Sequence, residues 1–148
     1  MSEETPVPNR IVVGIDGSES CREALRWAVR IAEPTGAGID AIMTWDVPAG
    51  MVGPYVPTAW SPADDAKTVL SDTVQGAYGS DRPAGLRLLV RQGGAARILI
   101  EESEHAEMLV VGSRGLGGFS GMLLGSVSAN CAEHAHCPVL VVHEPRQP

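Results

Sequence analysis

The chain has 148 residues, of which 44% are hydrophobic, and this is the size of one domain with enough apolar material for one core. Its 11 Lys and Arg residues against 18 Asp and Glu give a formal net charge of −7, and Lys67 is the only lysine. This composition argues against a nucleic-acid partner, because a duplex-binding surface needs clustered cations and these arginines are scattered among acidic residues.

The sequence shows no membrane or export signal. Its first apolar run, residues 11–15, is too short to span a bilayer, and residues 1–10 lack the basic start and long apolar stretch of a signal peptide. The 3 cysteines are too few for a disulfide framework. We therefore expect one domain over residues 1–148, without membrane contact, in the cytoplasm and with reduced thiols.

The first elements are expected to be a buried strand and a helix. Residues 10–15 form a β-branched run that ends in a turn sequence, which is typical of a buried strand. Ser20 and Glu23 have the spacing of a capping box, and apolar residues then recur at helical spacing as far as Pro34. The pattern predicts a helix that Ser20 caps.

The rest of the chain repeats the alternation of strand and helix. Strands are expected over 38–45, 86–90, 106–111 and 138–142, and helices over 62–79, 95–104 and 126–134. The segment 46–62 carries prolines and glycines without any period, which predicts a long surface loop. This order indicates an α/β fold with a parallel sheet and helices on both faces, and such sheets bind ligands where the strand order reverses.

The glycine-rich stretch 112–125 leaves a buried strand and returns at the start of a helix. Glycines allow positive φ angles and let the backbone approach a polyphosphate closely enough for amide N–H groups to bond it. The helix start favours the same anion. No Lys-Ser or Lys-Thr follows the last glycine, so this is not a Walker loop. Backbone amides, the hydroxyls of Ser126 and Ser128, Arg114 and a divalent cation are expected to neutralise the charge.

A glycine-rich loop can also be a flexible turn that serves only packing. Two features favour an anion site. The loop leads directly into a hydroxyl-rich helix start, and Asp16 ends the first strand at the same edge of the sheet.

Gly112-x-x-Gly115, nine residues and then Gly125-Ser126 resembles the nucleotide-binding signature of the ATP-binding branch of the universal stress protein family. The resemblance extends over nearly the whole chain, including Ile11-Val-Val-Gly-Ile-Asp-Gly-Ser18 and Cys137-Pro-Val-Leu-Val-Val142. It implies an adenine-nucleotide alpha-hydrolase-like α/β fold, with a five-stranded parallel sheet in the order 3-2-1-4-5.

The resemblance also implies a set of site residues. Gly14, Ile15 and Asp16 would line the nucleoside side, with Asp16 also facing ribose or Mg²⁺, and the backbone of Trp45 would meet the adenine edge. Val111, Gly112 and Gly115 would contact the ribose and first phosphates, in a segment that includes Ser113 and Arg114. Gly125, Ser126, Val127 and Ser128 would hold the outer phosphates.

The function implied by the resemblance is a nucleotide-dependent signalling or binding module in the stress response, which binds ATP with Mg²⁺ and acts on an unknown downstream protein. Leu116 stands where relatives often carry Arg or Lys, so ADP or AMP is expected to bind comparably. The alternative is a slow Mg-dependent ATP hydrolase or phosphotransferase, in which Asp16 holds Mg²⁺. The loop offers no His, Lys or Glu as base or charge clamp, which disfavours rapid catalysis.

A metal clip is a second alternative, because Cys131, His134, His136 and Cys137 fall within seven residues and suit zinc. Structural zinc sites usually use well-spaced pairs in turns. The favoured reading buries Cys131 in the last helix and places both histidines near the negative end of that helix.

The last strand, residues 138–142, is expected at an edge of the sheet. Its sequence is apolar, and exposed edge strands tend to pair with another chain. We expect a homodimer in which this strand meets its symmetry mate, as the resemblance implies.

Overall fold

The computed structural model describes residues 9–46, 61–115 and 124–144. Its elements in chain order are β1 (Arg10–Ile15), α1 (Glu19–Thr35), β2 (Gly38–Trp45), α2 (Pro62–Tyr78), β3 (Leu86–Gln92), α3 (Ala95–Ser103), β4 (Met108–Gly112), α4 (Ser126–His134) and β5 (Val139–Val142). Each predicted strand and helix is present, with ends that agree within about two residues. The predicted loop over 46–62 lies largely outside the described residues.

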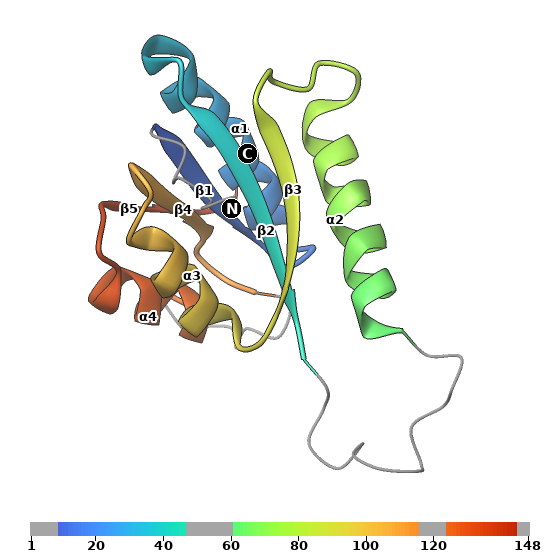
Figure 1. The fold of residues 1–148 in the computed structure, drawn as a ribbon, viewed down its shortest axis with the longest axis vertical. Coiled ribbons are helices and arrows are strands. Elements are labelled where there is room, and N and C mark those ends of the chain that lie inside the picture. The colour runs from blue at the N-terminus through green and yellow to red at the C-terminus, as the bar shows by residue number, and fades with distance from the viewer. Residues whose placement is uncertain (1–8, 47–60, 116–123, 145–148) are drawn as a thin grey trace, which may run out of the picture.

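The five strands form one parallel sheet in the order β3-β2-β1-β4-β5, which confirms the expected topology. The chain runs outward from β1 through β2 to β3 and then crosses to β4 and β5 (Figure 1). The strand order therefore reverses between β1 and β4, and the carboxyl ends of these two strands mark the expected ligand site.

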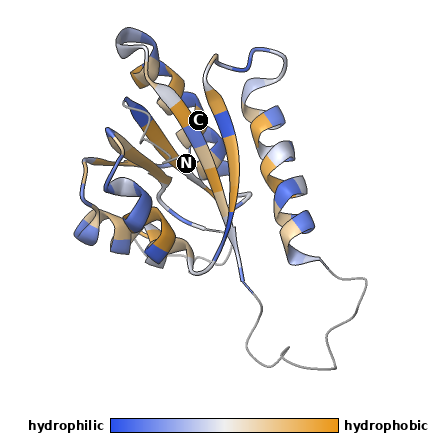
Figure 2. Ribbon diagram, in the orientation of Figure 1, coloured by the Kyte–Doolittle hydropathy of each residue, from blue (hydrophilic) through white to orange (hydrophobic). Residues whose placement is uncertain are grey.

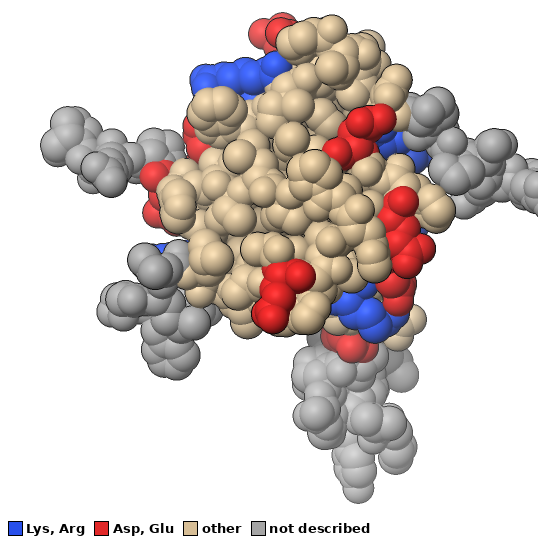
Figure 3. All heavy atoms as spheres, turned by 90° about the vertical axis from the view of Figure 1, so that its left-hand side faces the viewer, with Lys and Arg blue, Asp and Glu red and all other residues tan. Residues whose placement is uncertain are grey.

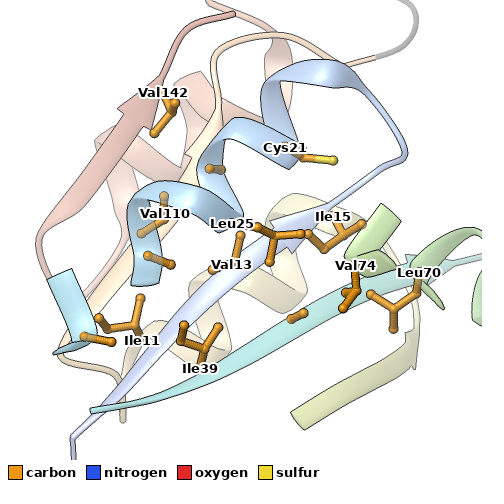
Figure 4. Packing of buried hydrophobic residues seen from close by; sticks show 14 residues of the cluster. Ile11, Val13, Ile15, Cys21, Leu25, Ile39, Leu70, Val74, Val110 and Val142 are labelled. Atoms are coloured by element: carbon orange, nitrogen blue, oxygen red, sulfur yellow. The ribbon is translucent and has the colours of Figure 1, made fainter. Parts of the chain in front are cut away.

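Helices cover both faces of the sheet, and each face has its own apolar core (Figures 1 and 2). On one face, α1 packs over alternate residues of β1, including Ile11 and Val13, and α2 packs over β2 and β3 (Figure 4). On the other face, α3 and α4 pack over Val12 and the neighbouring strands. The alternation of side chains along a strand explains why both faces of β1 are buried.

The prediction that Ser20 caps the first helix is wrong. Ser18 is the N-cap of α1, and its hydroxyl accepts a hydrogen bond from the Cys21 amide at 3.4 Å. Ser20 lies in the first turn and is fully buried. Either serine could cap a helix by sequence alone, and the contact that Ser20 makes with the loop after β4 decides between them.

A buried ion cluster lies near the amino ends of β1, β2 and β3, at the other end of these strands from the predicted site. Asp40 in β2 accepts hydrogen bonds from Arg10, and from Arg87 through two contacts of 2.7 Å. Burial alone would raise the pKa of Asp40, but the two arginines outweigh that effect and hold it below its usual value. The cluster ties β1, β2 and β3 together.

None of the helices in the described ranges combines the length and the apolar character that crossing a bilayer requires.

Candidate functional site

A cavity of about 320 Å³ opens at the carboxyl ends of β1, β2 and β4, where the strand order reverses. It is lined by Gly14, Ile15, Asp16, Ser18, Cys21, Ile42, Thr44, Ala95, Leu99, Val111, Gly112, Arg114, Gly115, Gly125, Ser126, Val127 and Ser128. Small-molecule sites are typically about 300–1,000 Å³ and mostly apolar with a few polar groups. This cavity has the size and composition of such a site.

The structure brings most of the predicted site residues together around this cavity. The segments 14–16, 111–112, 114–115 and 125–128 all line it. Ser113 does not line the cavity. It is buried, and its amide donates to the Val142 carbonyl at 2.8 Å. Leu116, which was expected to weaken binding of the outermost phosphate, lies outside the described residues.

Trp45 is not among the lining residues, whereas its neighbour Thr44 is. Successive side chains of a strand point to opposite faces, so Thr44 shares the face of Ile42, which packs with α3. The Trp45 carbonyl accepts a hydrogen bond from the Gly93 amide at 2.8 Å. The end of β2 therefore presents Thr44 to the cavity.

The sequence analysis missed the apolar end of the cavity. Ile42 and Thr44 come from β2, and Ala95 and Leu99 come from the first turns of α3. A Cβ on Gly14 would lie 2.7 Å from Leu99 Cδ1, so this glycine lets α3 pack closely on β1. Strand alternation could have identified Thr44, but the position of Leu99 depends on how α3 packs.

Hydrogen bonds close the base of the loop that joins β4 to α4. The Gly125 amide donates to the Ser113 carbonyl at 2.7 Å. The buried Ser128 hydroxyl also shares its proton between the Ser113 carbonyl at 2.9 Å and the Gly125 carbonyl at 3.1 Å. Ser128 was expected to offer its hydroxyl to a phosphate, and the structure instead uses this hydroxyl to hold the two ends of the loop together.

Gly112 and Gly115 at the start of the loop are needed for close approach and not for positive φ angles. Gly112 and Gly115 are not among the residues with positive φ, and Gly125 has φ −71°. A Cβ on Gly112 would lie 2.2 Å from the Ser20 hydroxyl oxygen. The expectation of positive φ is therefore wrong for these three glycines, and the others in the loop lie outside the described residues.

The start of α4 faces the cavity without a side-chain cap. Its N-cap is Gly125, which makes no side-chain capping bond, and the first intrahelical bond runs from the Ala129 amide to the Gly125 carbonyl at 3.0 Å. The amides of Ser126, Val127 and Ser128 therefore have no intrahelical acceptor. With the positive end of the helix dipole, these amides favour an anion in the cavity.

Asp16 lines the same cavity as this helix start. Its Oδ1 accepts a hydrogen bond from the Ser18 amide at 2.9 Å, and a Cβ on Gly115 would lie 2.8 Å from its Oδ2. Among the described lining residues Asp16 is the only carboxylate, and Arg114 is the only Arg or Lys. A cation between Asp16 and a bound anion would be attracted to both.

Cys21 also lines the cavity, although its side chain is almost fully buried. Burial raises the pKa of the Cys21 thiol, and the Asp16 carboxylate adds to this effect while hydrogen bonds oppose it. The thiol stays protonated at neutral pH, which disfavours a nucleophilic role because the thiolate is the reactive form.

The zinc-clip alternative is not supported. No group of three or more potential ligands lies together in the described part of the chain, which includes Cys131, His134, His136 and Cys137. Cys131 is buried in α4, and burial raises its pKa to about 11. Both histidines are exposed near the end of α4, as the favoured reading expected.

Comparison with known proteins identifies the family. The family model described as "Universal stress protein family" matches residues 8–143. The chain belongs to the universal stress protein family. A universal stress protein of Mycolicibacterium smegmatis is 34% identical over 132 residues, which cover 89% of this chain and 45% of that protein. The chain thus spans about half the length of the curated family members that it matches.

Solved structures of universal stress proteins share the fold. A structure from Lactobacillus plantarum has a TM-score of 0.74 at 21% identity and covers 92% of this chain and 99% of that one. A universal stress protein in complex with cAMP has a TM-score of 0.70 at 26% identity and covers 93% of this chain and 98% of its own.

Proposed function

We propose that this chain binds an adenine nucleotide in the cavity and acts as a nucleotide-dependent binding or signalling module in the stress response. The observation that carries the proposal is the uncapped start of α4, which directs three main-chain amides into a cavity at the point where the strand order reverses. The cAMP complex of a family member supports adenine as the base.

In this proposal the ligand lies across the carboxyl ends of the strands. The base occupies the apolar end near Thr44 and Leu99, and the ribose lies over Asp16. The phosphates reach Gly115 and the amides at the start of α4. The backbone of Trp45 remains a proposed contact for the adenine edge, although its side chain lies on the other face of β2.

ATP with Mg²⁺ is the ligand that we propose, with ADP or AMP binding comparably. Mg²⁺ is usually held by one or two carboxylates together with phosphate oxygens and waters. Asp16 supplies one carboxylate, and its Oδ2 faces the loop at Gly115. These residues fit a Mg²⁺ that depends on the nucleotide phosphates for most of its ligands.

We propose that the chain binds the nucleotide and signals through it without hydrolysing it efficiently. The ionisable groups in the described lining are Asp16, Arg114 and the Cys21 thiol, whose pKa is raised. Phosphoryl transfer relies on several positioned charges and on a base or a positioned water. A slow Mg-dependent hydrolysis that uses Asp16 is the alternative, and rapid turnover of ATP by the purified protein would favour it.

The test is mass spectrometry of the nucleotide that is released when freshly purified protein is denatured. The wild-type chain should release an adenine nucleotide, and a double variant with Gly115→Val and Gly125→Val should release much less. Release of equal amounts from both proteins would contradict the proposed loop. Release of a different class of ligand by the wild-type chain would contradict the proposed function.

We also propose a homodimer through β5. This strand is at the edge of the sheet and, among the described strands, pairs with β4 alone, through the carbonyls of Pro138 and Val142 among others. Backbone groups alternate in direction, so Val139 and Val141 direct theirs outward. Figure 3 shows the side of the molecule on which β5 lies, and the middle of this side carries few charged side chains.

Sedimentation at micromolar concentration tests the dimer. It should give twice the 15.5 kDa of one chain, and a monomer mass would contradict the dimer.

The downstream protein partner and the cytoplasmic location remain predictions from the sequence.

A further inference from the structure

A buried hydroxyl on α1 contacts the main chain where β4 passes into the loop. Ser20 is fully buried, and its hydroxyl donates to the Arg114 carbonyl at 2.8 Å. The close approach of Gly112 to the same side chain leaves no room for a Cβ on that glycine. The first turn of α1 is therefore fitted against the start of the loop.

This contact belongs to a chain of hydrogen bonds that begins at Asp16. The Ser18 amide donates to Asp16 Oδ1, and the hydroxyl oxygens of Ser18 and Ser20 lie 3.2 Å apart. Each serine hydroxyl has one proton. Because Ser20 donates its proton to the Arg114 carbonyl, Ser18 is the donor in the serine pair, and the two hydroxyls donate in turn toward the loop.

We infer that Ser20 is a positioning residue for the phosphates of the bound nucleotide, an inference that rests on the proposed function. The carbonyl of Arg114 and the amide of Gly115 belong to one trans peptide group and point in opposite directions. Ser20 holds the carbonyl toward α1, so the Gly115 N–H points away from α1, and Gly115 lines the cavity. Ser20 itself is not among the lining residues.

Removing the Ser20 hydroxyl takes away the closest hydrogen bond to this peptide group. The Ser18 hydroxyl lies farther from the Arg114 carbonyl, at 3.4 Å, and would hold it less firmly. The peptide group would then have to be ordered when the ligand binds, which lowers affinity. The loss should apply to phosphates alone, because the contacts proposed for the base and ribose come from Thr44 in β2, Leu99 in α3 and Asp16 after β1.

The experiment is calorimetric titration of wild-type and Ser20→Ala protein with adenosine, AMP, ADP and ATP in the presence of Mg²⁺. The affinity of the variant for ADP and ATP should fall about tenfold, which is the effect of one hydrogen bond. Its affinity for adenosine should stay within about twofold of wild type.

Ser103→Ala is the matched control. Ser103 is also a buried serine with two hydrogen bonds, to the Ile100 carbonyl and from the His136 amide, and it does not line the cavity. This variant should lose stability but bind all four ligands as the wild type does. Equal binding of ATP by Ser20→Ala and wild type, or an equal loss for adenosine and ATP, would overturn the role of Ser20.

A second measurement uses the wild-type chain, so its result does not depend on whether a variant folds. The amide resonance of Gly115 should shift when ATP is added and shift little with adenosine. The role of Ser20 would be overturned if Gly115 did not respond to ATP while the amides of α4 did. If the wild-type chain bound none of the four ligands, the proposed function would fail, and the role of Ser20 with it.

Discussion

Gly115→Ala is the substitution that most sharply tests the arrangement of Asp16 and the loop. The added Cβ would lie 2.8 Å from Asp16 Oδ2, the one described atom within 4 Å of it. Gly115 does not have a positive φ, so alanine introduces no backbone strain. Asp16 Oδ1 is held by the Ser18 amide. Either the carboxylate must rotate away from that amide, or the loop must move outward.

Both responses disturb a contact between a charged group and the bound nucleotide. Such a contact contributes about 1.5–3 kcal/mol, which corresponds to about a 10- to 100-fold loss of affinity for Mg-ATP. Gly115 is exposed, so the free energy of unfolding should change by no more than about 0.5 kcal/mol. If Asp16 acts through Mg²⁺, the loss of affinity should shrink when Mg²⁺ is removed with a chelator.

Equilibrium dialysis with labelled ATP measures the affinity, and thermal denaturation measures the stability of the same samples. Gly76→Ala in α2 is the matched control, because its Cβ would make ordinary contact with Arg22 at 3.4 Å, and neither residue lines the cavity. This variant should bind ATP normally and gain up to about 1 kcal/mol of stability. If Gly115→Ala bound Mg-ATP as tightly as the wild type, the reasoning about Asp16 and the loop would be refuted.

Two further predictions concern buried groups. Asp40→Asn should cost about 3 kcal/mol of stability in urea at pH 7, because it leaves two arginines without their carboxylate. The lowered pKa of Asp40 means that its contribution is present above the unfolded value near 3.8 and is lost as the pH falls through the lower folded pKa. The difference between wild type and Asp40→Asn should therefore shrink in acid, and a constant difference down to about pH 2 would contradict this account. Bound ATP should slow the alkylation of Cys21, which lines the cavity, and leave the alkylation rate of Cys137 unchanged. Peptide mass spectrometry measures both rates, and equal Cys21 rates with and without ATP would count against the placement of ATP in the cavity.

The sequence was sufficient to predict the strands, the helices and the topology of the sheet, because these elements carry strong local signals. Pro62 after the cap Ser61 marks the start of α2, and Gly79 marks its end. The alternation of strands with helices then left few topologies for a parallel sheet. The loop from Gly112 to Ser126 was recognisable because glycine spacing is visible in the sequence.

The details that sequence reasoning missed depend on contacts between distant segments. The choice between Ser18 and Ser20 as the cap depends on the Arg114 carbonyl, more than ninety residues away. The burial of Asp40 within β2 depends on arginines at the starts of β1 and β3, which the sequence does not place beside it. Likewise, Thr44 faces the cavity only because α3 covers that face of β2.

The most direct test of the central claim is a crystal structure of the chain with Mg²⁺ and ATP. We expect phosphate oxygens within hydrogen-bonding distance of the Ser126 and Val127 amides, the cation beside Asp16, and the base at the end of the cavity near Thr44. A nucleotide bound elsewhere on the molecule, or a cavity that stays empty at saturating ATP, would contradict the claim.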